Sequence, residues 1–271
     1  MNEKSKKPVK KIISSAVESD SERGERIAKV IARLGLCSRR EAEKMIADRR
    51  VTLNGETVTT PATFVRPSDK IGVDGQSAGK REPLRLFLYH KPPGLITSAK
   101  DPEGRPTVFD ALPKTLPRLI SVGRLDLNTE GLLLLTNDGG LSRALELPSS
   151  GLIRTYRVRV HGRIHPERLE KLKEGLLWKG VRYGSIVATI EGVNEGTNTW
   201  LRMSLSEGKN REIRNVMEAL NLQVNRLIRL SYGPFELGPL KRGDLVEIKP
   251  KAIKDLLKEH LPEEILERLF S

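Results

Sequence analysis

Hydrophobic and polar positions in the first part of the chain predict two short helices followed by a hairpin. Apolar residues recur at helical spacing from Ile27 to Leu34, which predicts a first helix. Ser38 and Glu41 stand three apart before a second apolar stripe, the arrangement of a capping box that opens a helix. The alternating residues 51–58 surround Asn54-Gly55, and Asn-Gly between two alternating runs is a strong hairpin signal.

From residue 84 the pattern changes to short apolar strands separated by turns. The predicted strands are Leu84–His90, Leu119–Val122, Leu132–Thr136, Thr155–Val160, Ile186–Glu191, Thr199–Ser206, Gln223–Leu230 and Leu245–Lys249. Helical patterns occupy residues 140–147, 166–175, 209–221 and, with a break near Pro262, 252–270. Because the strands are not each followed by a helix, we expect an α+β fold with a largely antiparallel sheet flanked by helices.

These changes in pattern divide the chain into five segments. Residues 1–22 lack apolar periodicity, so we expect a disordered basic tail there. A small domain is expected over residues 23–75, and the small polar residues 76–83 are interpreted as a linker. The larger domain then covers residues 84–250, and residues 251–271 form a helical extension.

Charge and cysteine content narrow the class of protein. Among 271 residues, 48 are Lys or Arg and 35 are Asp or Glu, which gives a net charge of +13. Such a balance favours a polyanionic partner, most often nucleic acid, although it also serves solubility. The single cysteine excludes an intramolecular disulfide framework or a thiolate metal site and fits a reducing compartment. With no secretory signal and no apolar run of membrane-spanning length, we expect a cytoplasmic protein without membrane contact.

Basic residues gather in the small domain. Arg39 and Arg40 fall in the first turn of the second predicted helix, where the helix dipole disfavours cations unless an anion is near. An RNA phosphate would supply that anion, and the alternative is a solvated basic surface. The other candidate RNA-binding residues are Arg26, Lys29, Lys44, Arg49 and Arg50.

Two motifs in the larger domain carry candidate chemistry. In residues 123–139 a charged loop with Arg124 and Asp126 leads into an entirely apolar strand, which we expect to be buried on both faces. Asp126 is a candidate reactive carboxylate, or else a turn residue bonded to its own backbone. In residues 207–217, Arg211 and Arg214 share one face near a helix start, where cations are disfavoured unless an anion such as a phosphate or Asp126 is near. The alternative is a solvated basic face.

A third motif is the strand that contains Arg154 and Tyr156. Strand alternation places Arg157 and Arg159 on one side and Tyr156 on the other. Tyr156 is a candidate for stacking on a nucleic-acid base, and packing in the core is the alternative.

The small domain resembles the alpha-L RNA-binding domain of ribosomal protein S-four type. The matching strings are Glu25-Arg-Ile-Ala-Lys-Val30, Leu36-Cys-Ser-Arg-Arg-Glu-Ala42 and Arg50-Val-Thr-Leu-Asn-Gly55. This resemblance implies binding to structured RNA, mainly through the second helix.

The chain from Arg23 to Pro250 resembles the RsuA/RluB family of ribosomal RNA pseudouridine synthases, most closely the large-subunit RluB branch. Residues 123–139 and 207–217 are the most specific strings, and residues 91–94, 101–109 and 226–233 add to the likeness. The resemblance implies that Asp126 is the catalytic aspartate, that Tyr156 packs on the target base and that Arg214 pairs with the aspartate. Arg154 stands where the family has lysine.

The resemblance also implies how the enzyme works and what it binds. A uridine in ribosomal RNA, or in a pre-ribosomal particle, is flipped out and isomerised without cofactor or metal. Asp126 acts on the ribose, as a nucleophile or as a base, while Arg124, Arg211, Arg214 and Tyr156 bind the substrate. We expect a monomer.

Three other classes compete with this interpretation. A non-catalytic RNA-binding assembly factor would share the fold, but the combination of Asp126, Tyr156 and Arg214 argues for an enzyme. A methyltransferase would need a glycine-rich cofactor turn, and the chain has no such motif. His161 and His165 have ligand spacing, but no further metal ligands accompany them.

Overall fold

The computed structural model describes residues 24–192 and 198–270, so the predicted tail over residues 1–22 lies outside the described residues. The chain divides into two compact units between Glu82 and Pro83.

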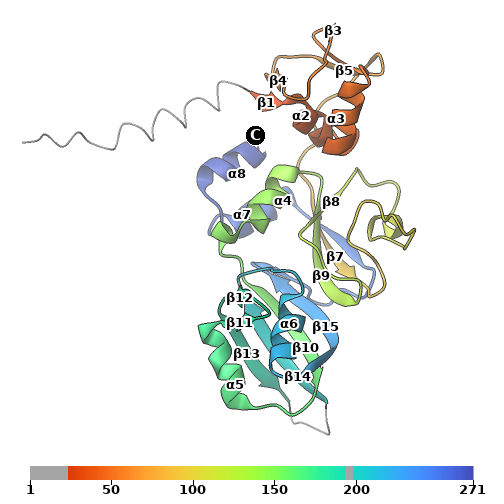
Figure 1. Cartoon of the computed structure of the whole chain (residues 1–271). Coiled ribbons are helices and arrows are strands. Elements are labelled where there is room, and N and C mark those ends of the chain that lie inside the picture. Colours follow the sequence, from red (N-terminus) through yellow and green to blue (C-terminus); the bar gives the residue numbers. More distant parts are fainter. Residues whose placement is uncertain (1–23, 193–197, 271) are drawn as a thin grey trace, which may run out of the picture. The chain divides into compact units, whose positions relative to one another are not determined.

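Two helices form the first half of the N-terminal unit (Figure 1). They are α2 (Ile27–Arg33) and α3 (Arg39–Ala47). The predicted capping box is present at the start of α3, because the Glu41 amide donates to Ser38 Oγ at 3.2 Å and the Ser38 amide donates to the Glu41 carboxylate at 2.7 Å. Apolar side chains of both helices, among them Ile31 and Ile46, are completely buried against each other.

Short strands complete this unit. β1 (Glu25–Arg26) pairs with β4 (Phe64–Val65), and a four-stranded sheet has the order β3-β2-β5-β6. The strands of that sheet are β2 (Val51–Leu53), β3 (Glu56–Thr57), β5 (Ile71–Val73) and β6 (Gln76–Ser77). Asn54 and Gly55 have φ values of 53° and 91°, which confirms the predicted two-residue hairpin turn.

The linker interpretation is wrong for residues 76 and 77. Asp74 and Gly75 repeat the same turn geometry, with φ values of 52° and 77°, and return the chain to pair with β5 as strand β6. An Asp-Gly pair is itself a hairpin signal, so Asp74-Gly75 predicts that a strand follows it. The small polar residues 76–81 suggested a linker instead.

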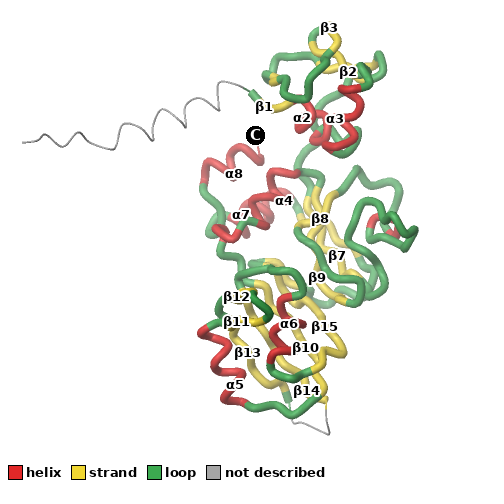
Figure 2. The backbone as a smooth tube through the Cα atoms, viewed as in Figure 1, coloured by secondary structure: helices red, strands yellow, loops and turns green. Residues whose placement is uncertain are grey.

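A nine-stranded sheet forms the centre of the second unit (Figure 2). Its main order is β13-β14-β10-β15-β9-β7-β17, and neighbouring strands in this order are antiparallel except for β15 and β9. The strands are β7 (Leu86–Lys91), β8 (Ile120–Val122), β9 (Thr129–Thr136), β10 (Arg154–His161), β13 (Ile186–Glu191), β14 (Asn198–Leu205), β15 (Gln223–Tyr232), β16 (Phe235–Glu236) and β17 (Leu245–Ile248). The predicted α+β class with a largely antiparallel sheet is therefore confirmed.

Different helices cover the two sides of this sheet, and they cover different strands. α5 (Pro166–Lys171) and α6 (Glu212–Ala219) pack on one side of β10, β13 and β14. α4 (Gly139–Glu146), α7 (Pro250–Leu257) and α8 (Glu263–Phe270) pack on the opposite side of the sheet, where β7 and β9 form it. All eight residues of β9 are buried, as the apolar pattern predicts.

Smaller elements join these parts. Three single turns of 3₁₀ helix occupy Phe109–Ala111, Pro148–Ser150 and Leu172–Glu174. The hairpin of β11 (Leu176–Trp178) and β12 (Val181–Tyr183) was not predicted, because its turn is Lys179-Gly180 and the strands are only three residues long.

Candidate active site

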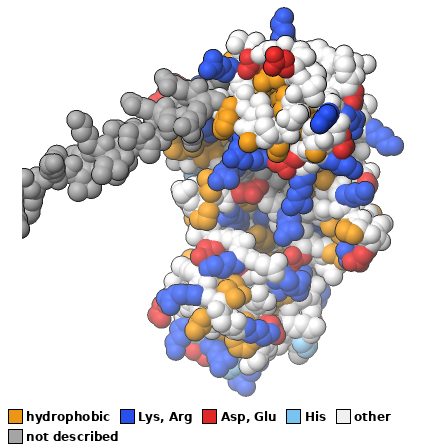
Figure 3. All heavy atoms as spheres, turned by 45° about the horizontal axis from the view of Figure 1, so that its top comes forward, with side chains coloured by type: hydrophobic (Ala, Val, Ile, Leu, Met, Phe, Trp, Pro, Cys, Tyr) orange, Lys and Arg blue, Asp and Glu red, His pale blue; other side chains and the backbone are white. Residues whose placement is uncertain are grey.

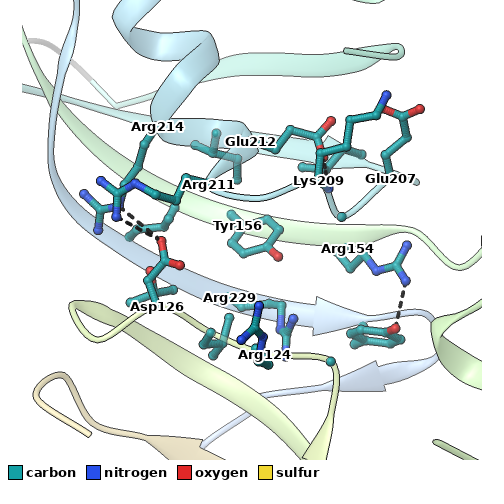
Figure 4. A pocket seen from close by; sticks show the side chains of 18 of the residues that line it. Arg124, Asp126, Arg154, Tyr156, Glu207, Lys209, Arg211, Glu212, Arg214 and Arg229 are labelled. Atoms are coloured by element: carbon teal, nitrogen blue, oxygen red, sulfur yellow. Dashed lines mark hydrogen bonds and ion pairs between the residues drawn. The ribbon is translucent and has the colours of Figure 1, made fainter. Parts of the chain in front are cut away.

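A cavity of about 420 Å³ lies in the second unit, on the side of the sheet that α6 covers. Its lining residues come from the loop before β9, from β10, from β15 and from the start of α6, as Figure 4 shows. Asp126, Arg124, Tyr156, Arg211 and Arg214 all line it. The structure therefore brings together all five residues that were predicted for catalysis and substrate binding.

The loop that carries Asp126 is fixed by backbone hydrogen bonds. The Thr129 amide donates to the Asp126 carbonyl at 3.0 Å, and the Gly94 amide donates to the Leu127 carbonyl at 2.8 Å. Thr97 Oγ1 donates to the Leu125 carbonyl at 2.9 Å. Since β9 is buried on both sides, this loop leads into a rigid strand, and the Asp126 side chain is held at the lining of the cavity.

A buried lysine holds the same loop through its backbone carbonyls. Lys91, at the end of β7, is completely buried, and the three N–H groups of its Nζ are shared among four carbonyls. The acceptors are the carbonyls of Pro92 at 3.1 Å, Asp126 at 3.2 Å, Leu127 at 3.2 Å and Thr129 at 2.9 Å. Burial lowers the pKa of Lys91 to about 8, against the opposing effect of the Asp126 and Glu130 charges. This role is not visible in the sequence, because three of the four carbonyls belong to residues 35 to 38 positions away.

Two arginines from the start of α6 face Asp126. Arg211 is the N-cap residue with φ 50°, and its Nη1 lies 3.6 Å from Asp126 Oδ2. The Nε of Arg214 lies 3.7 Å from the same oxygen. Burial lowers the pKa of Arg214, and the charge of Arg211 acts in the same direction while Asp126 opposes it. Asp126 is therefore an anion of the kind that cations at a helix N-terminus require.

Tyr156 lies in the middle of the cavity, between Asp126 and Arg154 (Figure 4). It is only partly buried and lines the cavity, so part of its side chain is accessible from the cavity. Arg154 is buried and donates to the Tyr232 hydroxyl at 2.8 Å and to the Leu152 carbonyl at 3.1 Å. Arg154 thus supports the wall of the cavity.

β15 supplies a further arginine that the sequence analysis missed. Arg229 is 3% exposed, and its Nε donates to the Leu132 carbonyl at 2.7 Å. Its Nη2 is buried and has no hydrogen-bond partner among the described residues. A Cβ at Gly131 would lie 2.3 Å from the Arg229 carbonyl, so only glycine permits this close pairing of β9 and β15. Arg229 thus belongs to the lining of the cavity and has one side-chain nitrogen without a partner among the described residues.

Carboxylates occupy the other end of the cavity. Glu207 accepts from the Gly184 amide at 2.9 Å and from Lys209 Nζ at 2.8 Å. Glu212 is 4% exposed and accepts from the Lys209 amide at 2.9 Å. Burial raises the pKa of Glu212 to about 6; the Lys209 amide opposes this, and the charge of Glu207 adds to it. This end of the cavity therefore offers both acceptors and a carboxyl group that titrates near neutral pH.

The predicted RNA-binding residues of the N-terminal unit are all exposed. Arg50 pairs with Asp74 through two hydrogen bonds of 2.7 Å, and Lys29 pairs with Glu25 at 2.7 Å. Arg39 lies 3.5 Å from Glu43. The remaining cations of this group form no ion pair within the described part of the chain, and they are Arg26, Arg40, Lys44 and Arg49. Figure 3 shows many Lys and Arg side chains among fewer Asp and Glu side chains on the face in view.

Membrane-spanning helices and metal clusters are not found in the described part of the chain. Within residues 24–192 and 198–270, no helix has the length and apolar character of a membrane span. In the same residues no three His, Cys, Asp or Glu side chains gather as a metal site. His165 instead lies 3.3 Å from Glu167.

Comparisons with known proteins agree on one family. The family model described as RNA pseudouridylate synthase matches residues 85–219, and the S4 domain model matches residues 25–71. An uncharacterized RNA pseudouridine synthase of Rickettsia typhi is 45% identical over 236 residues, which are 87% of this chain and 96% of that protein. Ribosomal large subunit pseudouridine synthase B of Pasteurella multocida is 42% identical over 244 residues, which are 87% of this chain and 70% of that protein. A crystal structure of pseudouridylate synthase has a TM-score of 0.61 at 28% identity and covers 86% of this chain and 100% of that one.

Proposed function

Because the chain belongs to the RNA pseudouridylate synthase family, we propose that it converts a specific uridine of large-subunit ribosomal RNA to pseudouridine, with Asp126 as the catalytic residue. The choice of RNA follows relatives such as the Pasteurella multocida protein, which is named for the large ribosomal subunit. The S4 domain supports binding to that RNA through its exposed cations. The free rRNA and a pre-ribosomal particle both present such a substrate.

The observation that carries the proposal is the position of Asp126. Its carboxylate lies within 3.7 Å of two guanidiniums and at the end of a cavity whose centre is Tyr156. A flipped uridine that stacks on Tyr156 places its ribose toward this carboxylate. Arg211 and Arg214 balance the negative charge of Asp126 and leave further N–H groups for a phosphate of the substrate.

The reaction exchanges one bond of the ribose for another. The bond between C1′ and N1 of the uracil breaks, the base turns, and C5 forms the new bond to C1′; the proton of C5 is lost and N1 gains one. Asp126 acts at the ribose, either as a nucleophile on C1′ or as a base that starts an elimination. Both routes require a carboxylate with no proton.

The remaining groups of the cavity have roles that fit the detached base. Tyr156 stacks on the uracil and keeps it from leaving while it turns. Arg229 adds positive charge to the lining of the cavity, which favours the negatively charged RNA. At the opposite end of the cavity Glu212 and Glu207 can accept from an N–H group of the base.

Pseudouridine mapping of ribosomal RNA from a deletion strain tests the proposal. We expect one or a few pseudouridines of the large-subunit RNA to be absent and to return when the wild-type gene is supplied, but not when Asp126→Asn is supplied. A deletion strain that keeps every pseudouridine would favour a non-catalytic assembly factor instead.

A further inference from the structure

The sheet of the second unit has one side that helices cover only in part. α5 and α6 pack on the other side of β10, β13 and β14, against Val158 and Leu201. On the partly covered side, α4, α7 and α8 pack against β7, β9 and β15, for example against Leu132 of β9 and Ile228 of β15. In the described chain no helix belongs to a common apolar cluster with the outward residues of β10, β13 and β14, among them Val187, which is 46% exposed.

The uncovered part of this side carries five arginines and one tryptophan. The strand register sets Arg157 opposite Arg202, and Arg159 opposite both Trp200 and Arg226. Residues directly opposite in an antiparallel pair point to the same side of the sheet. Arg242, from the loop before β17, joins them by sharing the Glu130 carboxylate with Arg226. We call this set the arginine face: Arg157, Arg159, Arg202, Arg226, Arg242 and Trp200.

Two guanidiniums lie over the ring of Trp200, which belongs to none of the apolar clusters of the described chain. The Cζ of Arg157 lies 4.4 Å from the ring centroid, and the Cζ of Arg226 lies 5.9 Å from it. Trp200 is only partly buried. Guanidiniums and a partly exposed indole on one side of a sheet offer positive charge to a phosphate and a flat ring to an unpaired nucleotide base.

Two carboxylates hold the arginines in place without neutralising them. Glu191 accepts from Arg157 at 2.7 Å and from Arg202 at 2.8 Å. Each carboxylate serves two guanidiniums, so with Arg159 the face has five positive and two negative charges. Arg157, Arg202, Arg226 and Arg242 keep side-chain exposures of 43%, 53%, 42% and 51%. Each guanidinium has five N–H donors, so most donors remain available to a ligand.

We propose that the arginine face is a second RNA-binding surface of the enzyme, which binds the phosphates and unpaired bases of a segment remote from the target uridine. This proposal rests on the proposed function, because the substrate is RNA. Acidic protein partners would also meet positive charge, but an indole among the arginines favours bases over carboxylates. Since the cavity opens on the opposite side of the sheet, a short RNA that fills the cavity does not reach this face, whereas a long one can pass around the sheet edge.

The test compares two double variants with equal loss of charge. Arg157→Gln with Arg202→Gln removes two cations of the arginine face and leaves Trp200 and Arg226 in place. The control, Lys171→Gln with Lys173→Gln, removes two exposed cations at the end of α5, on the other side of the sheet. Dissociation constants are measured at several salt concentrations with a large-subunit rRNA transcript and with a hairpin trimmed around the uridine that the wild type modifies in that transcript.

We expect the arginine variant to bind the transcript roughly tenfold more weakly and to reduce the slope of log K against log salt by about 1 to 2, as loss of two phosphate contacts requires. Its affinity for the hairpin should match that of the wild type, which also shows that the variant is folded. The lysine control should match the wild type with both RNAs. Unchanged affinity and salt slope for the transcript, or equal weakening by both double variants, would overturn the proposal.

Pseudouridine formation by the wild type on the same transcript keeps the two proposals separate. A transcript that binds through the arginine face but is never modified would contradict the proposed function and leave the second surface standing. A transcript that is modified with full affinity by the arginine variant would contradict the second surface alone.

Discussion

Replacement of Lys91 by methionine tests whether a buried ammonium holds the Asp126 loop. Methionine has a similar length and no charge, so Lys91→Met removes the hydrogen bonds that the ammonium shares among four carbonyls and still fills the space of the lysine side chain. The ammonium has three N–H groups, and a hydrogen bond from a charged donor contributes about 2 kcal/mol, which gives about 6 kcal/mol for the three. Burial of the ammonium opposes this, since the lowering of its pKa from 10.5 to about 8 corresponds to about 3 kcal/mol. The difference predicts that Lys91→Met lowers the free energy of unfolding by about 3 kcal/mol at pH 7.

The same substitution should change stability and catalysis in ways that a merely lost contact would not. The pKa of Lys91 is lowered on folding, so the unfolded chain binds more protons between pH 8 and 10.5, and the wild type gains stability over that range relative to the variant. Two of the four carbonyls belong to Asp126 and Leu127, so the Asp126 carboxylate should drift from its position and single-turnover pseudouridine formation should fall about 100-fold.

Urea unfolding at pH 7 and at pH 8 to 10.5, with single-turnover assays on rRNA, measures these effects. Lys114→Met is the matched control, because Lys114 is exposed in the same unit. If Lys91→Met were as stable and as active as the control, burial of the charge would outweigh its hydrogen bonds, and Lys91 would not position Asp126.

Three further predictions concern other groups. Glu212→Gln should remove a pH dependence of stability. Burial raises the pKa of Glu212 from 4.5 to about 6, so the wild type should lose about 2 kcal/mol of stability relative to the variant as pH rises from 4.5 to 7. Urea titrations of both proteins measure this, and a constant difference between their free energies of unfolding over that range would refute it. Glu130→Gln leaves Arg226 and Arg242 without their carboxylate and should lower the free energy of unfolding by about 1 to 2 kcal/mol. Thermal melts measure this loss, and an unchanged melting temperature would contradict it. Arg39→Gln with Arg40→Gln should weaken binding to rRNA by about fivefold and leave the saturated single-turnover rate unchanged, whereas a slower rate with normal affinity would contradict a docking role.

The sequence predicts those parts of the fold that depend on local patterns. The capping box of Ser38, the turn at Asn54-Gly55 and the buried strand β9 each follow from residues within a few positions of one another. The hairpin at Lys179-Gly180 escaped prediction because its strands are short and its turn lacks the usual Asn or Asp.

Site residues divide in the same way. The cations at the start of α6 predict a nearby anion, and in the structure this anion is Asp126, 85 residues before Arg211. Lys91 and Arg229 gave no such signal, because a lysine at a strand end and an arginine in a strand are ordinary surface residues. Only the tertiary contacts, 35 to 38 residues away for Lys91 and 97 residues away for Arg229, show that they are buried.

Single-turnover pseudouridine formation by purified Asp126→Asn tests the central claim most directly. The substitution keeps the shape of the side chain and removes its charge, so we expect the rate on rRNA to fall by at least about 10³-fold while the dissociation constant stays within about twofold of the wild type. Asp255→Asn, at an exposed position of α7, should retain full activity. A rate for Asp126→Asn close to that of the wild type would contradict the role of this carboxylate and with it the proposed mechanism.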